Sequence, residues 1–420
     1  MSGTQTEASP TPSVHPGRWW GLLVLIVLFR IGGNAANRLF YPFLPLLQRG
    51  LGVSFEAMTQ ALSWRVVAPV VAVPLTLWVE RRRPQWGLLL GVALFLLGYG
   101  GLGLWPSWPL FVLAVMAVLV GKVVSDAALQ DWISRQVPYH RRGLPLAFIE
   151  LAWSLSFFAG MPLLAWLFAR GPWTLPFLAL AGFITLTGLL LYGGLNRNHR
   201  EEGSAPFRSG GGWRLHPADV RALWQRHGRY VKQGVLPGLW FGFACLVANE
   251  MVGLVFGDWL YRVHGLRVQG LGLAAMAIGV GELLGEVVAM TAADPLGKRR
   301  VVAAGLVLNT LVALALPYVG GWSVTAALVA LALFFFTFEF ALVSAIPLMS
   351  GVWPQHRALT MAAFAVALVW GRSAAAALTP WVYLPWGVLG SALTAALWNA
   401  LALVGVWHLQ EGESTPTERV

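Results

Sequence analysis

Long runs of apolar residues, separated by short polar clusters, occupy most of the chain. Each run reaches the roughly 20 residues that a helix needs to cross the hydrocarbon core of a bilayer. Twelve such runs lie at 19–47, 57–79, 86–105, 108–134, 144–169, 173–194, 235–261, 268–292, 299–318, 321–349, 357–380 and 385–408. The pattern predicts an all-α, polytopic membrane protein with twelve transmembrane helices.

One long hydrophilic stretch divides these runs into six and six. We expect a disordered cytoplasmic tail over 1–18, helical bundles over 19–194 and 235–408, a linker over 195–234, and a second tail over 409–420. Within the linker, residues 217–227 fit a basic amphipathic helix at the membrane interface, and equally a solvated turn.

Composition and charge support a membrane location. Apolar residues make up 57% of the chain and charged residues 11%, whereas soluble domains carry about 25% charged residues. The net charge of +11 comes from Lys and Arg clusters between the apolar runs, as the positive-inside rule describes. We therefore expect a multi-pass protein of the cell membrane with both termini in the cytoplasm, and no nucleic-acid partner.

No cofactor is indicated by the sequence. The single cysteine, Cys245, excludes a disulfide within the chain, and no Cys/His cluster has the spacing of a metal site. A glycine-rich phosphate loop is also missing, so ATP is not expected as the direct energy source. None of the eight histidines stands in a catalytic cluster, which argues against an enzyme.

A similar polar loop follows the second apolar run of each half. Both loops combine an acidic residue, a basic cluster and a glycine eleven positions after the acid. The residues that we assign to this loop signature and to gating are Glu80, Arg81, Glu286, Asp294, Gly297, Lys298 and Arg299. In the first half the signature is degraded, since Arg83 stands where a glycine is expected.

The segment 294–300, together with the six-plus-six layout, resembles the major facilitator superfamily. Residues 41–45, 137–143 and 338–348 are similar to bacterial efflux-type members. The resemblance implies a monomeric secondary transporter that works by alternating access, with the solute bound between the halves near the midplane. The run over 144–169 carries Gly160-Met161-Pro162 rather than the adjacent Gly-Pro of many drug/proton antiporters. The resemblance therefore leaves proton antiport open.

Polar side chains inside the first apolar run form a stripe. Arg30, Asn34, Asn37 and Arg38 share one helical face. Buried charges cost several kcal/mol in a bilayer unless they face a cavity or a partner. We expect the stripe to line the central cavity; the alternative is packing against a carboxylate of a neighbouring helix. Arg65, in the second run, is expected to snorkel partly toward the outer surface.

Further intramembrane charges are candidates for solute binding or proton coupling. Lys122 and Asp126 are four residues apart and can pair, either as a static pair or as one that exchanges partners. Glu250 and Arg372 are candidates for the cavity. Asp126, Glu282 and Glu339 are candidates for proton coupling.

Partners are expected for several of these charges. Glu282 and Glu286 lie one turn apart, so both would not ionise comfortably in a low dielectric. We expect Glu282 to face the cavity and Glu286 to latch onto the Lys298–Arg300 cluster or Arg357. Glu339 and Arg372 are expected to pair with each other or with the helix predicted over 268–292. Gly281 and Gly285 permit close helix approach.

The sequence thus favours a secondary transporter that exports a small hydrophobic or amphipathic solute, with protons as the candidate coupling ion. The alternatives are uptake of a small metabolite by symport or uniport, a membrane-embedded transferase, and a sensor on a transporter scaffold. Trp64, Trp153 and Trp370 are candidates for stacking on the solute.

Overall fold

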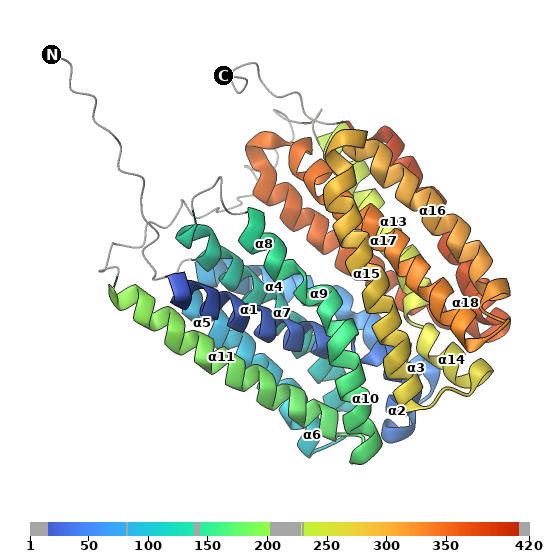
Figure 1. Cartoon of the computed structure of the whole chain (residues 1–420), viewed down its shortest axis with the longest axis horizontal. Helices are drawn as coiled ribbons and strands as arrows, with labels where there is room; N and C mark the ends of the chain where they lie inside the picture. The colour runs from blue at the N-terminus through green and yellow to red at the C-terminus, as the bar shows by residue number, and fades with distance from the viewer. Residues whose placement is uncertain (1–15, 81–82, 138–142, 202–227, 229–230, 411–420) are drawn as a thin grey trace.

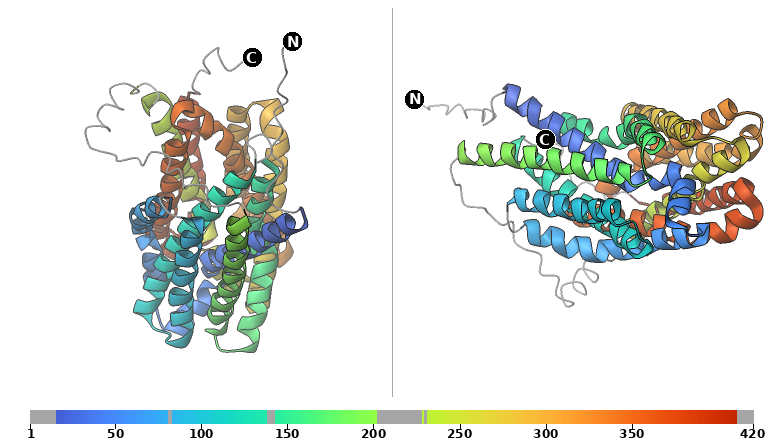
Figure 2. Two further views of the ribbon diagram at one scale, coloured as in Figure 1. Left: turned by 90° about the vertical axis from the view of Figure 1, so that its left-hand side faces the viewer. Right: turned by 90° about the horizontal axis from the view of Figure 1, so that it is seen from below.

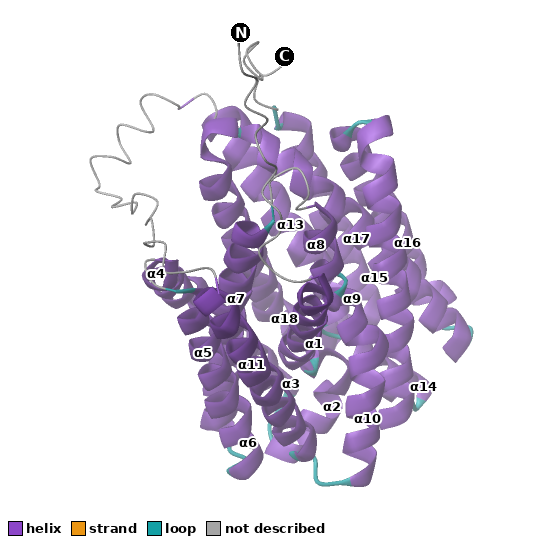
Figure 3. Ribbon diagram, turned by 60° about the vertical axis from the view of Figure 1, so that its left-hand side comes forward, coloured by secondary structure: helices purple, strands orange, loops and turns teal. Residues whose placement is uncertain are grey.

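The computed structural model describes residues 16–80, 83–137, 143–201, 228 and 231–410. Every regular element within these ranges is helical (Figure 3). Residues 1–15 and 411–420 of the predicted tails, the segment 217–227 and Arg81 lie outside the described residues, and so do the side chains of Glu80 and Asp294. Residues 16–18, which were predicted as part of the disordered tail, begin the first helix.

The first half supplies six spans, several of them broken into shorter helices. The helices are α1 (Pro16–Arg38), α2 (Phe40–Leu51), α3 (Phe55–Ser63), α4 (Ala68–Glu80), α5 (Pro84–Phe95), α6 (Gly101–Leu104), α7 (Trp108–Gln136), α8 (Gly143–Glu150), α9 (Ala152–Leu155), α10 (Met161–Arg170) and α11 (Leu175–Glu201). A 3₁₀ turn, Trp64–Val67, joins α3 to α4. π-Helical turns at Leu96–Gly100 and Ser156–Gly160 interrupt spans three and five.

The second half contains longer helices. They are α13 (Leu236–Gly253), preceded by a π-helical turn at Val231–Val235, then α14 (Phe256–His264), α15 (Val268–Leu296), α16 (Lys298–Val319), α17 (Val324–Val352) and α18 (Arg357–His408), with a 3₁₀ turn, Pro354–His356, before α18.

Helix α18 contains two spans. It runs for 52 residues, far more than one crossing needs, and Gly387 interrupts it with φ 58° and ψ −150°. Only glycine adopts that backbone conformation readily. The described residues hold eleven helices that are long and apolar enough to span a bilayer, and the break at Gly387 divides the last of them. The predicted twelve-helix fold is therefore confirmed.

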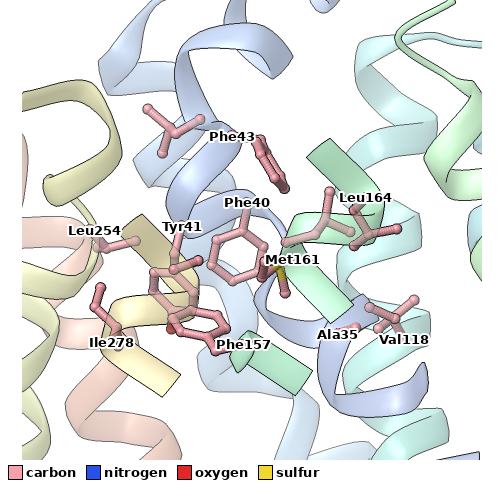
Figure 4. Packing of buried hydrophobic residues seen from close by; sticks show 14 of the residues in the cluster. Ala35, Phe40, Tyr41, Phe43, Val118, Phe157, Met161, Leu164, Leu254 and Ile278 are labelled. Carbon is pink, nitrogen blue, oxygen red and sulfur yellow. The ribbon is translucent and has the colours of Figure 1, made fainter. Parts of the chain in front are cut away.

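The two halves lie side by side, with the first half coloured blue to green and the second yellow to red (Figures 1 and 2). A large hydrophobic cluster crosses between them. Figure 4 shows Phe40, Tyr41 and Phe157 of the first half beside Leu254 and Ile278 of the second. Large apolar side chains also cover the outer surface, where Leu97 is 70% and Trp381 79% exposed. Such a surface suits lipid rather than water.

Glycines bring the halves together at the end where α2 and α14 lie. An added Cβ at Gly279 of α15 would lie 2.5 Å from the backbone nitrogen of Phe158. At Gly272, a Cβ would lie 2.5 Å from that of Ala165, and at Gly257 it would meet the carbonyl of Tyr41. Small residues permit such backbone approach in membranes. This end of the interface is therefore closed.

Candidate functional site

Charged side chains from both halves meet around a small central cavity. It has a volume of about 10 Å³, which is room for about one water molecule. Its polar lining comes from α1, α2, α9, α13, α15 and α18: Arg38, Tyr41, Trp153, Asn249, Glu250, Glu282 and Arg372. All of these residues except Tyr41 and Asn249 were predicted as candidates from the sequence.

Arg38 and Glu282 form a buried ion pair between the two halves. The Arg38 Nη1 donates to Glu282 Oε2 at 3.0 Å, and Nη2 contacts Oε1. Their side chains are 3% and 1% exposed. The guanidinium also lies 3.5 Å above the Phe157 ring and 4.2 Å above the Trp153 ring. Both residues line the small cavity, and each charge is compensated by the other half.

A second charged group joins α2, α13 and α18. The Tyr41 hydroxyl donates to Glu250 Oε1 at 2.5 Å, and Arg372 Nη1 donates to the Tyr41 oxygen at 3.0 Å. The same nitrogen lies 3.4 Å from Glu250 Oε2. The expected pairing of Arg372 with Glu339, or with the helix predicted over 268–292 (α15), is therefore wrong. Glu250 lies on α13, and the Tyr41 hydroxyl links it to Arg372.

Glu339 is buried at the edge of this group without an ion pair. It is 3% exposed and accepts a hydrogen bond from Trp153 Nε1 at 3.0 Å. Within the described part of the chain, no cation lies in salt-bridge distance of its carboxylate. Among the described residues, the carboxylate of Glu339 thus has a neutral hydrogen-bond donor and no ion-pair partner.

A larger cavity, of about 530 Å³, lies between the halves beside these residues. Glu150, Glu286, Glu339, Trp153 and Arg372 line it, and the other lining side chains are apolar. Those apolar side chains belong to α15, α17 and α18: Ala289, Met290, Leu342, Val343, Ile346, Pro347 and Leu368. Because most lie near the ends of α15 and α17, the cavity lies toward the end of the molecule where α1 begins and α18 ends.

Glu286 lies in this cavity rather than at the basic loop. The Ser154 hydroxyl donates to its Oε1 at 2.5 Å, and the residue is 4% exposed. The expected latch to the Lys298–Arg300 cluster or Arg357 is wrong. Glu286 lies ten residues before the end of α15 at Leu296, which places it about 15 Å along the axis from the turn that precedes Lys298. Glu286 instead contacts the first half.

The Lys122–Asp126 pair forms as expected, and it is part of a larger network. Lys122 Nζ donates to Asp126 Oδ2 at 2.5 Å. Arg30 Nε lies 3.2 Å from Asp126 Oδ1, and Arg30 Nη1 lies 2.8 Å from Glu150 Oε1. Arg30 therefore packs against carboxylates of neighbouring helices, the alternative to lining the central cavity. Gln130 also reaches Glu150, at 3.4 Å.

The other members of the helix 1 stripe are buried within the first half. Asn37 accepts a hydrogen bond from Arg65 Nη2 at 2.8 Å. Arg65 is only 4% exposed and lies over the Phe40 ring, so the expected snorkelling is wrong. Asn34 is 1% exposed, and neither polar atom of its side chain has a hydrogen-bond partner among the described residues.

The described part of the loop signature begins at a turn. Gly297 has φ 86° between α15 and α16, and Lys298 begins α16. Arg299 contacts the backbone carbonyl of Trp407 at the end of α18. No gating contact of this loop across the halves falls within the residues that the structure describes.

Three site residues, Tyr41, Asn249 and Ser154, were not predicted from the sequence, because each helix was considered by itself. Tyr41 lies three residues after Arg38, so it continues the polar stripe of helix 1 past the break between α1 and α2. Ser154 adjoins Trp153 and precedes the π-helical turn at Ser156–Gly160. Such turns are often found at functional sites.

Comparison with known proteins identifies the fold. The sequence profile described as "Major Facilitator Superfamily" matches residues 22–256. No curated protein sequence matches the chain. The crystal structure of a D-xylose-proton symporter aligns with a TM-score of 0.75 at 14% identity, over 94% of this chain and 98% of that one.

Two other solved structures are similar. An inward-facing, unoccupied bacterial homolog of the human lysosomal transporter Spinster gives a TM-score of 0.69 at 15% identity, over 94% and 98% of the two chains. A POT family transporter in complex with a thioalcohol-conjugated peptide gives 0.72 at 14% identity, over 92% and 95%. Identities this low establish a shared fold. The protein is a multi-pass membrane transporter, and it belongs to the Major Facilitator Superfamily.

Proposed function

We propose that this transporter exports a small amphipathic solute by alternating access, with the solute entering from the cytoplasm. The cavity of about 530 Å³ carries the proposal. Its apolar walls suit a hydrophobic body, and its carboxylates and Arg372 suit a polar or charged group. The positive-inside rule assigns the open end of this cavity to the cytoplasm, because the loops at that end carry most of the Lys and Arg residues.

The closed end supports alternating access. Gly272 and Gly279 pack against the first half there, while the cavity separates the halves at the other end. Opening the closed end would require α15 to withdraw from α10 and the π-helical turn before it. Arg38 and Glu282 lie between the two ends, where an ion pair can hold the halves in register during this motion.

Proton coupling is assigned to Glu339 within this proposal. Its carboxylate is buried at the cavity and accepts a hydrogen bond from a neutral donor, Trp153. A carboxylate in that setting can bind a proton in one state and release it in the other. Asp126, in contrast, contacts both Lys122 and Arg30, which favours a permanent charge.

Flux through proteoliposomes tests the transport proposal. The purified protein is reconstituted, and the exchange of each compound in a panel of radiolabelled amphipathic solutes is measured with and without an imposed proton gradient. Val343→Trp should abolish exchange because the indole fills the cavity. Val329→Trp is the matched control on the same helix: Val329 is 53% exposed on the outer surface, so exchange should persist. Equal exchange in both variants, or no flux of any solute, would reject the cavity as the solute path.

A further inference from the structure

We infer that the large cavity binds the solute as an organic cation, held by the two carboxylates of Glu286 and Glu339. The inference rests on the proposed function, since it names the class of solute that occupies the same cavity. It is carried by the charges that face the cavity and by the partners that each of them has.

Two of the four charged residues that line the cavity are already neutralised. Arg372 pairs with Glu250 at 3.4 Å, and Glu150 pairs with Arg30 at 2.8 Å. The nearby Arg38 and Glu282 neutralise each other. Among the described residues, the cations around the site on α1 and α18 therefore each have a carboxylate partner already.

The other two lining charges are carboxylates with neutral partners only. Glu339 accepts from the Trp153 indole, and Glu286 accepts from the Ser154 hydroxyl. Both are nine-tenths or more buried. The second carboxylate oxygen of Glu286, Oε2, has no hydrogen-bond partner among the described residues. A buried anionic oxygen without a partner is costly, so this atom marks the point where a ligand donor or cation would be stabilised.

Helix packing holds these two carboxylates at one wall of the cavity. Glu286 follows Gly285, where an added Cβ would lie 2.5 Å from the Phe336 carbonyl and 3.1 Å from the Cβ of Glu339. α15 and α17 are therefore in backbone contact at this level. Two negative charges on adjoining helices face an apolar space, which is an arrangement that favours a cation with a hydrophobic body over a neutral or anionic solute.

Two probes of nearly the same shape and opposite charge test the inference. Binding of tetraphenylphosphonium and of tetraphenylborate to the full chain in nanodiscs is measured by equilibrium dialysis. We expect tetraphenylphosphonium to bind and tetraphenylborate not to bind. Glu286→Gln and Glu339→Gln should each weaken tetraphenylphosphonium binding by about tenfold or more, because each removes a buried charge partner. Glu56→Gln is the matched control, since Glu56 is exposed near the closed end, outside this cavity.

The result that overturns the inference is equal binding of the two probes, or unchanged tetraphenylphosphonium binding in both Gln variants. If the two carboxylates bind protons only, the Gln variants lose flux driven by a proton gradient and tetraphenylphosphonium does not bind. That outcome rejects the cation and leaves the transport proposal intact. A failed transport proposal gives a different pattern, in which Val343→Trp has no effect on exchange, whatever binds in the nanodisc.

Discussion

Gly279 offers the sharpest test of how the closed end is held. In Gly279→Ala, the new methyl group would lie 2.5 Å from Phe158 N and 3.0 Å from the carbonyl carbon of Phe157, whereas ordinary contact begins at 3.4 Å. The opposing atoms belong to the backbone, so α15 must move away by about 1 Å. Overpacking of this kind costs about 1–3 kcal/mol. Because the open state lacks this contact, the ratio of open to closed molecules should rise about 5- to 150-fold.

Spin labels across the closed end measure this ratio. Ser54→Cys and Gln269→Cys place labels on the two halves, in a background with Cys245→Ala, and pulsed electron resonance gives the distance distribution in nanodiscs. Gly279→Ala should increase the long-distance population. Alanine variants at two other glycines serve as controls. Gly281 faces Ala332 within its own half, and a Cβ at Gly182 has nothing within 4 Å.

Gly281→Ala should therefore lower thermal stability without changing the distances, and Gly182→Ala should change neither. The reasoning is refuted if Gly279→Ala folds normally and its distance distribution matches that of the unmodified chain. It is equally refuted if Gly281→Ala opens the molecule as much as Gly279→Ala does.

Two further predictions concern buried polar contacts. Arg38→Met or Glu282→Met alone should destabilise the protein by about 3–5 kcal/mol, since each leaves a buried charge without its partner, whereas the double variant should recover most of that loss. Thermal unfolding in detergent distinguishes these cases, and additive losses would contradict them. Asn399→Leu removes a 2.8 Å hydrogen bond to Asn309 within the second half, and interhelical bonds in membranes contribute about 0.6–1.7 kcal/mol. Its loss of stability should therefore be smaller than that of either single charge variant.

The twelve spans could be predicted from the sequence because each one is a local property. A run of apolar residues long enough to cross the bilayer identifies a helix without reference to any other part of the chain. The Lys122–Asp126 pair was predictable for the same reason, since four residues bring two side chains to one helical face. The division of α18 was predicted as a gap at 381–384, and the break at Gly387 lies three residues after it.

The charge partners between helices were harder to predict. Arg38 and Glu282 are separated by 244 residues, and Arg372 and Tyr41 by 331. A sequence indicates that a buried charge needs a partner, but the choice depends on helix rotation and on close contacts such as the one at Gly285. Glu286 illustrates this point, because the basic loop is nearer in sequence and Ser154 is nearer in space.

The Arg38–Glu282 pair also has a consequence for biosynthesis. Helices enter the membrane in the order in which they are made, so Arg38 is inserted before the residue that neutralises it exists. At about 5–20 residues per second, the 244 residues between the two take roughly 10–50 s to synthesise. During that interval the nascent first half must keep a cation near water, lipid phosphate or the insertion machinery. Folding of the first half is then completed only when α15 is inserted. The first half expressed alone should therefore insert poorly into the membrane and be degraded readily by proteases.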